Sequence, residues 1–286
     1  MMQKLLALTL VLALVCGVFT AAGAVTFTDA HGNVIELDDS LEAYTLVLLS
    51  GKDGAARAGE TNLGDLWADA LRWFATSGAM NEAFEEDDVT AGNTKVDADE
   101  KHIVALWNGG NLRADIPEGT FGAEALAEVL PYPNKVAVVY MTGAQLLETL
   151  EAASQALPCT EETFDACASF MQVSGLSYTV DTSVAYDAGE AYGEKWFRAA
   201  SIGRVTISDV CGEPFDVAAT YAVITSNANF NGMDASYVFP EAAESNEKST
   251  ITTAVVRDVV WKYIAQQLNN VIGDEYAQPQ GRITVR

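Results

Sequence analysis

Strand-like and helix-like segments follow one another in an irregular order along this sequence, and that order restricts the fold more than any other feature. Apolar runs rich in β-branched residues predict strands at 44–51, 102–108, 135–141, 170–180, 204–210, 220–227 and 281–286. Apolar residues at helical spacing predict helices that begin near residue 61, at 123–129, at 143–157 and after residue 250. Regular alternation would favour a doubly wound sheet. Because the order is irregular, we predict the α+β class, with a mixed β-sheet and packed helices.

The predicted helices have start signals and apolar faces. The first begins at Thr61 or Asn62, and helical spacing places these residues on one face: Leu63, Leu66, Trp67, Ala70, Leu71 and Phe74. Thr142 and Gln145 have the spacing of a capping box, which predicts that the helix at 143–157 begins there. A long amphipathic C-terminal helix is predicted to carry Ile251, Val255, Val259, Trp261 and Ile264.

The N-terminus has the pattern of an export signal. Lys4 precedes an apolar run at 5–19, and the small-residue stretch Ala22-Gly23-Ala24 follows. These are the parts of a signal peptide, so we predict that residues 1–24 are removed before Val25. No other segment is apolar enough to span a bilayer, so no membrane span is expected after cleavage. The predicted location is extracytoplasmic, in a bacterial cell envelope or the extracellular medium, and an uncleaved membrane anchor is the alternative.

The chain is strongly acidic, with 40 Asp and Glu against 16 Lys and Arg and a net charge of −24. Nucleic-acid backbones and anionic membranes would be repelled, so neither is expected as a partner. An anionic ligand remains compatible with this charge only where a few Arg residues reverse the field locally.

The cysteines fit an exported protein. Cys159 and Cys167 flank the polar segment 160–166 and are predicted to form a disulfide in an oxidising compartment. Cys211 is left over, on a predicted strand. The cysteine spacing and the presence of only 2 His argue against a zinc site.

One segment invites a metal interpretation. Asp29-Ala30-His31-Gly32 has the Asp-x-His-Gly form that begins the ligand set of binuclear metallophosphoesterases, which need several His and carboxylates converging from separate loops. Only His102 could add another imidazole, so we interpret 25–43 as a hairpin segment with its turn at His31-Gly32-Asn33. The sequence has no Gly-x-Ser-x-Gly motif and no P-loop. We therefore predict no catalytic residue, no metal ligand and no cofactor.

Three separated regions carry a family pattern in order: 56–72, 105–122 together with 129–151, and 170–181. The specific combination is ETNLGDL at 60–66, NGGNLRADIP at 108–117 and MTGAQLL at 141–147. In this order they resemble the C-terminal domain of secreted 5'-nucleotidases and 2',3'-cyclic-nucleotide phosphodiesterases. The resemblance covers 44–286, nearly all of the expected mature chain. It implies a domain that recognises the nucleoside part of the substrate, while a separate N-terminal metallophosphoesterase domain hydrolyses the phosphate. The His-rich motifs that this sequence lacks belong to that other domain.

The resemblance implies which residues contact the ligand. Arg57 and Arg113 match ligand-contacting arginines, and a guanidinium suits phosphate, carboxylate or ribose oxygens. Asn108 offers an amide that can donate and accept hydrogen bonds at a base edge. Gly109 and Gly110 would let the backbone approach a ligand closely. The alternative is a structural Asn-Gly turn with arginines that pair with surface carboxylates.

The family holds the base between two aromatic rings, which contributes about 1–3 kcal/mol per base. The first ring position matches Tyr132. The second ring position is Ala228, so Phe230, two residues further on, is the candidate for the second ring. Asp234 matches the Asp of the loop that follows. Asn111 stands where the family usually has glycine, and the loop at 231–237 has lost two glycines, so a pocket reshaped for another ligand is an alternative.

Three functions follow as hypotheses. The leading one is a secreted, stand-alone domain that binds nucleosides or nucleotides and takes part in nucleotide catabolism or salvage. The second is one part of a split nucleotidase, whose partner would be a separate metallophosphoesterase chain. The third is a surface or interaction module that binds no nucleotide.

Overall fold

The computed structural model describes residues 25–28, 34–37 and 42–286. The predicted signal peptide and the turn at His31-Gly32-Asn33 lie outside the described residues. The strands that flank this turn, β1 (Val25–Thr28) and β2 (Val34–Leu37), pair antiparallel, as the predicted hairpin requires. None of the helices in the described ranges is both long and apolar enough to cross a membrane.

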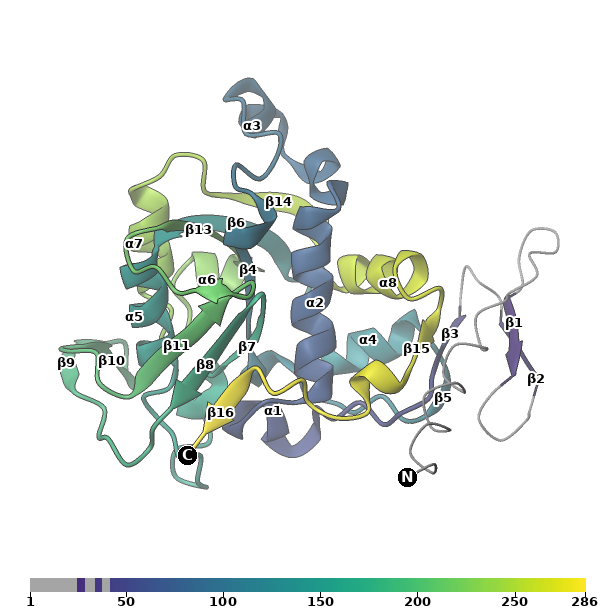
Figure 1. Ribbon diagram of the computed structural model, residues 1–286, viewed down its shortest axis with the longest axis horizontal. Coiled ribbons are helices and arrows are strands. Elements are labelled where there is room, and N and C mark those ends of the chain that lie inside the picture. Colours follow the sequence, from purple (N-terminus) through teal and green to yellow (C-terminus); the bar gives the residue numbers. More distant parts are fainter. Residues whose placement is uncertain (1–24, 29–33, 38–41) are drawn as a thin grey trace, which may run out of the picture.

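A mixed five-stranded sheet forms the centre of the molecule (Figure 1), with the strand order β14-β6-β13-β4-β7. The strands are β4 (Ile103–Asn108), β6 (Lys135–Thr142), β7 (Met171–Ser174), β13 (Thr220–Ser226) and β14 (Thr250–Val255). β13 runs parallel to β4 and antiparallel to β6, so the sheet is mixed, as predicted. All six residues of β4 are buried, because helices cover both faces of the sheet.

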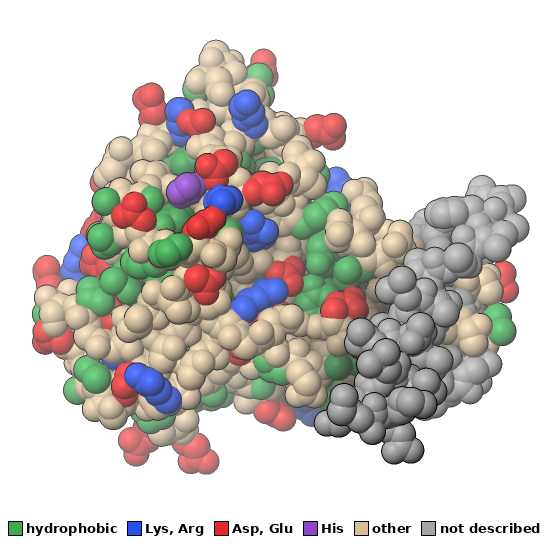
Figure 2. All heavy atoms as spheres, viewed as in Figure 1, with side chains coloured by type: hydrophobic (Ala, Val, Ile, Leu, Met, Phe, Trp, Pro, Cys, Tyr) green, Lys and Arg blue, Asp and Glu red, His purple; other side chains and the backbone are tan. Residues whose placement is uncertain are grey.

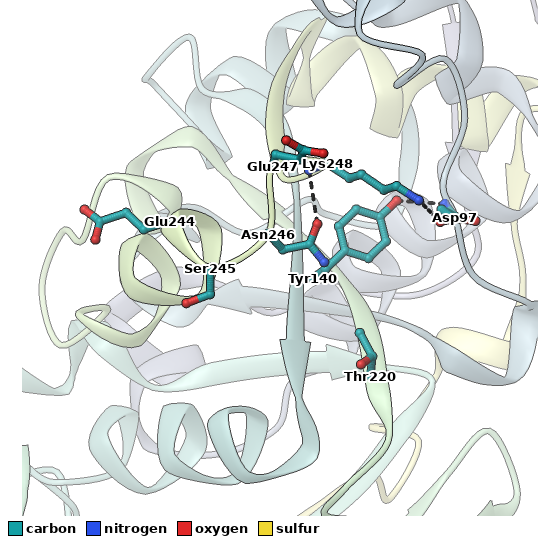
Figure 3. A pocket seen from close by; sticks show the side chains of 8 residues that line it. All are labelled: Asp97, Tyr140, Thr220, Glu244, Ser245, Asn246, Glu247 and Lys248. Atoms are coloured by element: carbon teal, nitrogen blue, oxygen red, sulfur yellow. Dashed lines mark hydrogen bonds and ion pairs between the residues drawn. The ribbon is translucent and has the colours of Figure 1, made fainter.

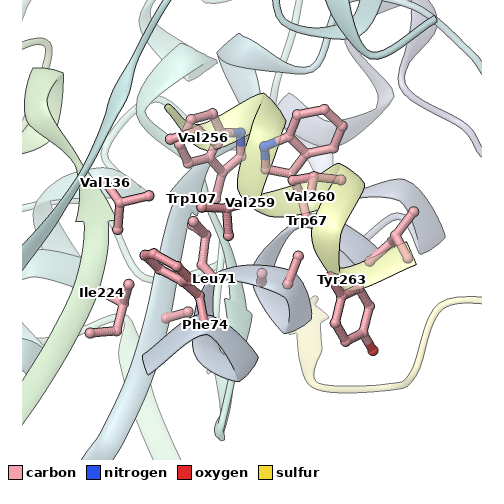
Figure 4. Close-up of a cluster of buried hydrophobic side chains, with 14 of the residues drawn as sticks. Trp67, Leu71, Phe74, Trp107, Val136, Ile224, Val256, Val259, Val260 and Tyr263 are labelled. Carbon is pink, nitrogen blue, oxygen red and sulfur yellow. The ribbon is translucent and has the colours of Figure 1, made fainter. Parts of the chain in front are cut away.

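Helices α2 (Asn62–Thr76) and α8 (Val256–Gln266) cover one face of this sheet, and Figure 4 shows the apolar cluster that they form with the sheet. The N-cap of α2 is Thr61, whose hydroxyl accepts a hydrogen bond from Gly64 N at 3.0 Å. The predicted apolar face of α2 is buried. Trp67 lies on this face and contacts Trp107 of β4, with 6.3 Å between the ring centroids.

Helices α5 (Gly143–Ala153) and α7 (Val238–Glu244) cover the opposite face. Side chains alternate along β4: Ala105 and Trp107 join the α2 cluster, whereas Val104 and Leu106 join the α5 cluster. The predicted capping box is present at the start of α5, with Thr142 and Gln145 bonded reciprocally.

Smaller elements surround these layers. A four-stranded sheet has the order β12-β11-β8-β16, with strands β12 (Glu213–Pro214), β11 (Val205–Val210), β8 (Leu176–Val180) and β16 (Ile283–Val285). A three-stranded sheet contains β15 (Val271–Ile272), β3 (Glu42–Thr45) and β5 (Gly119–Gly122). Strands β9 (Ala188–Tyr192) and β10 (Trp196–Ala199) form a separate hairpin. The remaining α-helices are α1 (Ala55–Ala58), α3 (Glu86–Thr90), α4 (Ala123–Val129) and α6 (Asn227–Phe230).

The prediction for the start of the C-terminal helix is wrong. Ile251 and Val255 lie in strand β14, and α8 begins only at Val256. The segment 250–255 is rich in β-branched residues, which favour a strand, and Thr252 is fully buried with its hydroxyl bonded to the Val136 carbonyl at 2.9 Å. The first predicted strand is also shorter than 44–51, since β3 ends at Thr45.

A buried polar cluster attaches the C-terminal strand to α2. Arg282 forms a bidentate ion pair with Asp69, at 2.8 Å and 2.9 Å. Its Nη1 lies 3.7 Å from Asp65, which is fully buried. Glu60 accepts hydrogen bonds from the backbone N–H groups of Arg282 and Ile283. Desolvation, followed by the negative charge of Glu60, raises the pKa of Asp65 to about 8.

We expect this raised pKa to make the folded state less stable as the pH rises. The folded protein binds a proton on Asp65 that the unfolded chain releases near pH 4, so stability falls between about pH 4 and pH 8, by at most about 1.4 kcal/mol per pH unit. Asp65→Asn keeps an acceptor for Gln280 N and should remove this slope. Urea titrations at several pH values measure it. Equal slopes in the two proteins would contradict the prediction.

Candidate functional site

Three segments that are distant in sequence meet beside the end of β4. They are α1, the 3-10 turn at Gly109–Asn111, and the loop that leads into the 3-10 turn at Ala166–Ser169. The Gly109 N–H donates to the Phe170 carbonyl at 2.7 Å. A Cβ on Gly109 would lie 1.8 Å from the Ala56 carbonyl oxygen, and one on Gly110 would lie 2.5 Å from the Ala168 side chain. These glycines therefore allow close approach of other parts of the chain, where the sequence predicted close approach of a ligand.

The two predicted arginines each lie over an exposed aromatic ring. The Arg113 guanidinium carbon is 5.1 Å from the centroid of the Tyr132 ring, and Arg113 Nε donates to the Gly110 carbonyl at 3.1 Å. The Arg57 guanidinium carbon is 4.4 Å from the centroid of Phe164, and its Nη1 donates to the Phe164 carbonyl at 2.9 Å. Tyr132 is 47% exposed and Phe164 is 37% exposed. Aromatic surface is thus available beside both cations.

Asp234 lies near both arginines. Burial raises the pKa of the Asp234 carboxyl, and three nearby cations oppose that rise: Arg57, Arg113 and Lys195. Residue 234 has a φ of 56°, in the left-handed region where Asp is more common than most non-glycine residues. Its carboxylate makes no hydrogen bond or ion pair with the described part of the chain. A half-buried acceptor without a protein partner suits a ligand hydroxyl.

Asn108 lies at the end of β4, and its contact with a ligand stays a prediction. Its side chain is buried, and its Oδ1 accepts a hydrogen bond from Asn111 Nδ2 at 2.9 Å. Asn111 is the residue that departs from the family glycine. Asn111, in place of the family glycine, therefore donates to the side-chain amide oxygen of Asn108, which is one of the groups predicted to contact a base.

Phe230 is half-buried and packs against the apolar cluster beneath α5, and it makes no ring contact with Tyr132. Its role as the second ring stays a prediction. Phe164 was not predicted, because it lies in the polar segment 160–166, where a lone aromatic residue produces no periodic signal. A lone aromatic residue in a polar segment is the only sequence feature that could have marked Phe164 as a candidate site residue.

One cavity adjoins this cluster and another lies apart from it. One, of about 510 Å³, borders Phe164 and is lined by residues of 53–58 and 159–161. The other, of about 490 Å³ (Figure 3), is lined by Asp97, Tyr140, Thr220 and 244–248. Two of its charged groups, Lys248 and Asp97, pair with each other, and the Asp97 backbone N–H donates to Tyr140 Oη at 2.7 Å. The second cavity contains none of the predicted site residues.

Cys159 and Cys167 are both free thiols in this structure. The predicted disulfide is therefore not formed in it, although the two thiols lie close enough for Cys159 to affect the pKa of Cys167. Burial, and then hydrogen bonding to Cys159, raises the pKa of the Cys167 thiol. Because the two side chains are adjacent, pairing under oxidising conditions stays a prediction. Among the residues that the structure describes, no group of His, Cys, Asp and Glu side chains could hold a metal ion.

Comparison with known proteins decides the family. The sequence pattern of the family described as 5'-nucleotidase, C-terminal domain, matches residues 40–241. This chain belongs to that family. The trifunctional nucleotide phosphoesterase YfkN of Bacillus subtilis is 30% identical over 204 residues, which are 71% of this chain and 11% of YfkN. The cell wall protein Lmo0130 of Listeria monocytogenes is 29% identical over 192 residues, 64% of this chain and 19% of Lmo0130.

Two solved structures have a similar fold. The 5'-nucleotidase precursor from Thermus thermophilus is similar with a TM-score of 0.60 and 28% identity, over 85% of this chain and 39% of that one. The NAD nucleotidase of Haemophilus influenzae has a TM-score of 0.56 at 15% identity, over 92% of this chain and 48% of that one, which shows the fold alone. This family member therefore spans less than a fifth of YfkN and Lmo0130 and less than half of these solved chains.

Proposed function

We propose that this chain binds a nucleoside or nucleotide at the cluster of Arg57, Arg113, Tyr132 and Asp234, and takes part in nucleotide catabolism or salvage. The observation that carries the proposal is the Asp234 carboxylate, which is half-buried, lies near two arginines and has no partner among the described residues. A sugar hydroxyl would donate a hydrogen bond to this carboxylate, because an ionised carboxylate can only accept hydrogen bonds. Tyr132 would stack on the base through the face that Arg113 leaves open.

The charges of the molecule support a local site of this kind. Asp and Glu side chains are spread over the face seen in Figure 2, with fewer Lys and Arg among them. Arg57 and Arg113 have no carboxylate within ion-pair distance in the described part of the chain. Two arginines without such partners can offset the acidic background where a ligand binds.

Isothermal titration with adenosine, AMP and uridine tests the proposal directly. Saturable heat for at least one of them is expected. A folded protein that gives no heat with any of the three would overturn it.

Tyr132→Ala should weaken nucleoside binding by about 1–3 kcal/mol, because the variant loses the stacking surface. Tyr132→Phe is the matched control, since it keeps the ring and should bind within about twofold of the native protein. Titration with adenosine measures both variants. Equal affinities of the native protein and Tyr132→Ala would show that this ring does not contact the base.

The length of the relatives favours a second candidate function. YfkN is named a nucleotide phosphoesterase and is much longer than the matched region, so this chain could complete an enzyme whose metallophosphoesterase domain is a separate partner. Phosphate release from AMP with Mn²⁺, measured with and without such a partner, distinguishes this role from simple binding. The name of the cell wall protein Lmo0130 supports the further proposal of an extracytoplasmic location.

A further inference from the structure

The β9–β10 hairpin, at the left of Figure 1, contacts both loops of the candidate site. Tyr192 and Trp196 lie directly opposite each other where the two strands meet the turn. Tyr192 Oη donates to the Gly232 carbonyl at 2.6 Å, in the loop that carries Asp234. Trp196 Nε1 donates to the Ala166 carbonyl at 3.2 Å, at the start of the 3-10 turn that ends the other loop. One hydrogen bond therefore joins the hairpin to each loop.

The hairpin is supported independently of these two bonds. Tyr192 and Trp196 pack against a small buried cluster that includes Tyr237. The ring centroids of Tyr192 and Tyr237 are 5.6 Å apart, and Tyr237 Oη accepts a hydrogen bond from the Ala199 backbone N–H at 2.9 Å. Tyr237 Oη in turn donates to Glu148 Oε1 on α5 at 2.8 Å. Because packed side chains hold the hairpin in place, a variant that lacks one of the two bonds should still fold.

The loop that carries Asp234 has a backbone that needs such support. Gly232 and Asp234 both have left-handed backbone, with φ of 78° and 56°. For a residue with a side chain this conformation is less favourable than the right-handed or the extended one. Backbone hydrogen bonds hold the loop to α6, such as Met233 N to the Ala228 carbonyl at 3.0 Å. Tyr192 holds it to the hairpin, and lies so close that a Cβ on Gly232 would be 2.4 Å from its hydroxyl oxygen.

We propose that Tyr192 and Trp196 are positioning residues, which hold the two loops of the candidate site in the conformation that binds the nucleoside. This inference rests on the proposed function and adds how its site keeps its shape before the ligand arrives. A loop that already has the binding conformation costs less to order when the ligand binds, so the affinity is higher. Both residues act through the loops and not by contact with the ligand.

Adenosine titration into three variants tests the proposal. Tyr192→Phe keeps the ring and loses the hydrogen bond, so the affinity should fall about fivefold, which corresponds to one net hydrogen bond. Trp196→Phe should weaken binding to a similar extent. Tyr186→Phe is the matched control, because Tyr186 Oη also donates to a carbonyl, that of Phe197 in β10, at 2.8 Å. The hairpin then loses the same kind of bond but neither loop does, so the affinity should stay within about twofold of the native value.

Amide hydrogen exchange measures the loops without any ligand. In Tyr192→Phe, exchange across 231–237 should be about fivefold faster than in the native chain, because the loop opens more often. In Trp196→Phe, the segment 160–169 should respond instead. Tyr186→Phe should leave both segments unchanged, and urea unfolding should show similar small losses of stability in all three variants.

Equal effects of Tyr192→Phe and Tyr186→Phe on affinity and exchange would overturn the inference, since the Tyr192 hydroxyl would then be only structural, while nucleoside binding would stand. Unchanged exchange across 231–237 in Tyr192→Phe would overturn it as well. If the folded native chain binds none of adenosine, AMP and uridine, the proposed function is overturned, and the exchange rates alone then decide whether Tyr192 holds the loop.

Discussion

Arg282→Ala should lower the free energy of unfolding by about 3–5 kcal/mol, because the variant leaves the Asp69 carboxylate without its bidentate cation. The Asp69 side chain is only 18% exposed, so water can replace the guanidinium only in part. The same side chain donates to the Val173 carbonyl at 3.0 Å, so β16 also loses a connection to β7. Urea unfolding followed by circular dichroism measures the change.

Arg286→Ala is the matched control, because it removes the same charge and because Arg282 and Arg286 flank the same strand, β16. Arg286 pairs with Asp181 at 3.4 Å, but its side chain is 69% exposed, so its replacement should cost less than about 1 kcal/mol. If the two variants lose similar stability, the buried cluster does not stabilise the fold through its charge pairing.

Gly109→Ala should weaken both folding and ligand binding. The added methyl would lie 1.8 Å from the Ala56 carbonyl oxygen, which is backbone and cannot rotate away. Helix α1 must then move, which carries Arg57 away from the site and breaks the hydrogen bond from Gln172 Nε2 to the same carbonyl. Overpacking of this kind costs about 1–3 kcal/mol or more of stability. We expect adenosine affinity to fall by at least about tenfold, since positioning of Arg57 is lost.

Gly59→Ala is the control, because Gly59 ends α1 in extended backbone and has nothing within 4 Å of an added Cβ. It should fold and bind like the native chain. Chemical unfolding and adenosine titration on both variants separate the two effects. Native-like binding by Gly109→Ala would mean that the position of α1 does not govern the site.

The elements with strong periodicity were predicted well. The start of α2, the whole of α4, the capping box of α5 and the core strands β4, β6 and β13 follow from local spacing, because a buried face imposes its own period on the sequence. The β9–β10 hairpin was not predicted, since its strands are mostly exposed and carry no apolar alternation. The boundary between β14 and α8 was misplaced, because one run of apolar residues serves both elements.

The motif that identified the family turns out to be largely structural. In the segment 60–65, Glu60 and Asp65 bind the C-terminal segment, Thr61 caps α2, and Asn62 donates to the carbonyls of Leu48 and Tyr276. Gly64 allows the Gln172 side chain to lie against the helix. Such residues connect segments that are more than 200 positions apart, so their roles are invisible in local sequence.

Residue types and their spacing were enough to predict the α+β class, the family and the buried faces, because each of these depends on patterns along the chain. The pairs of side chains that meet in the folded protein could not be predicted in this way: Arg57 with Phe164, Asn108 with Asn111, and Lys195 with Asp165. These contacts join loops, whose positions depend on how distant elements pack and not on any period in their own residues.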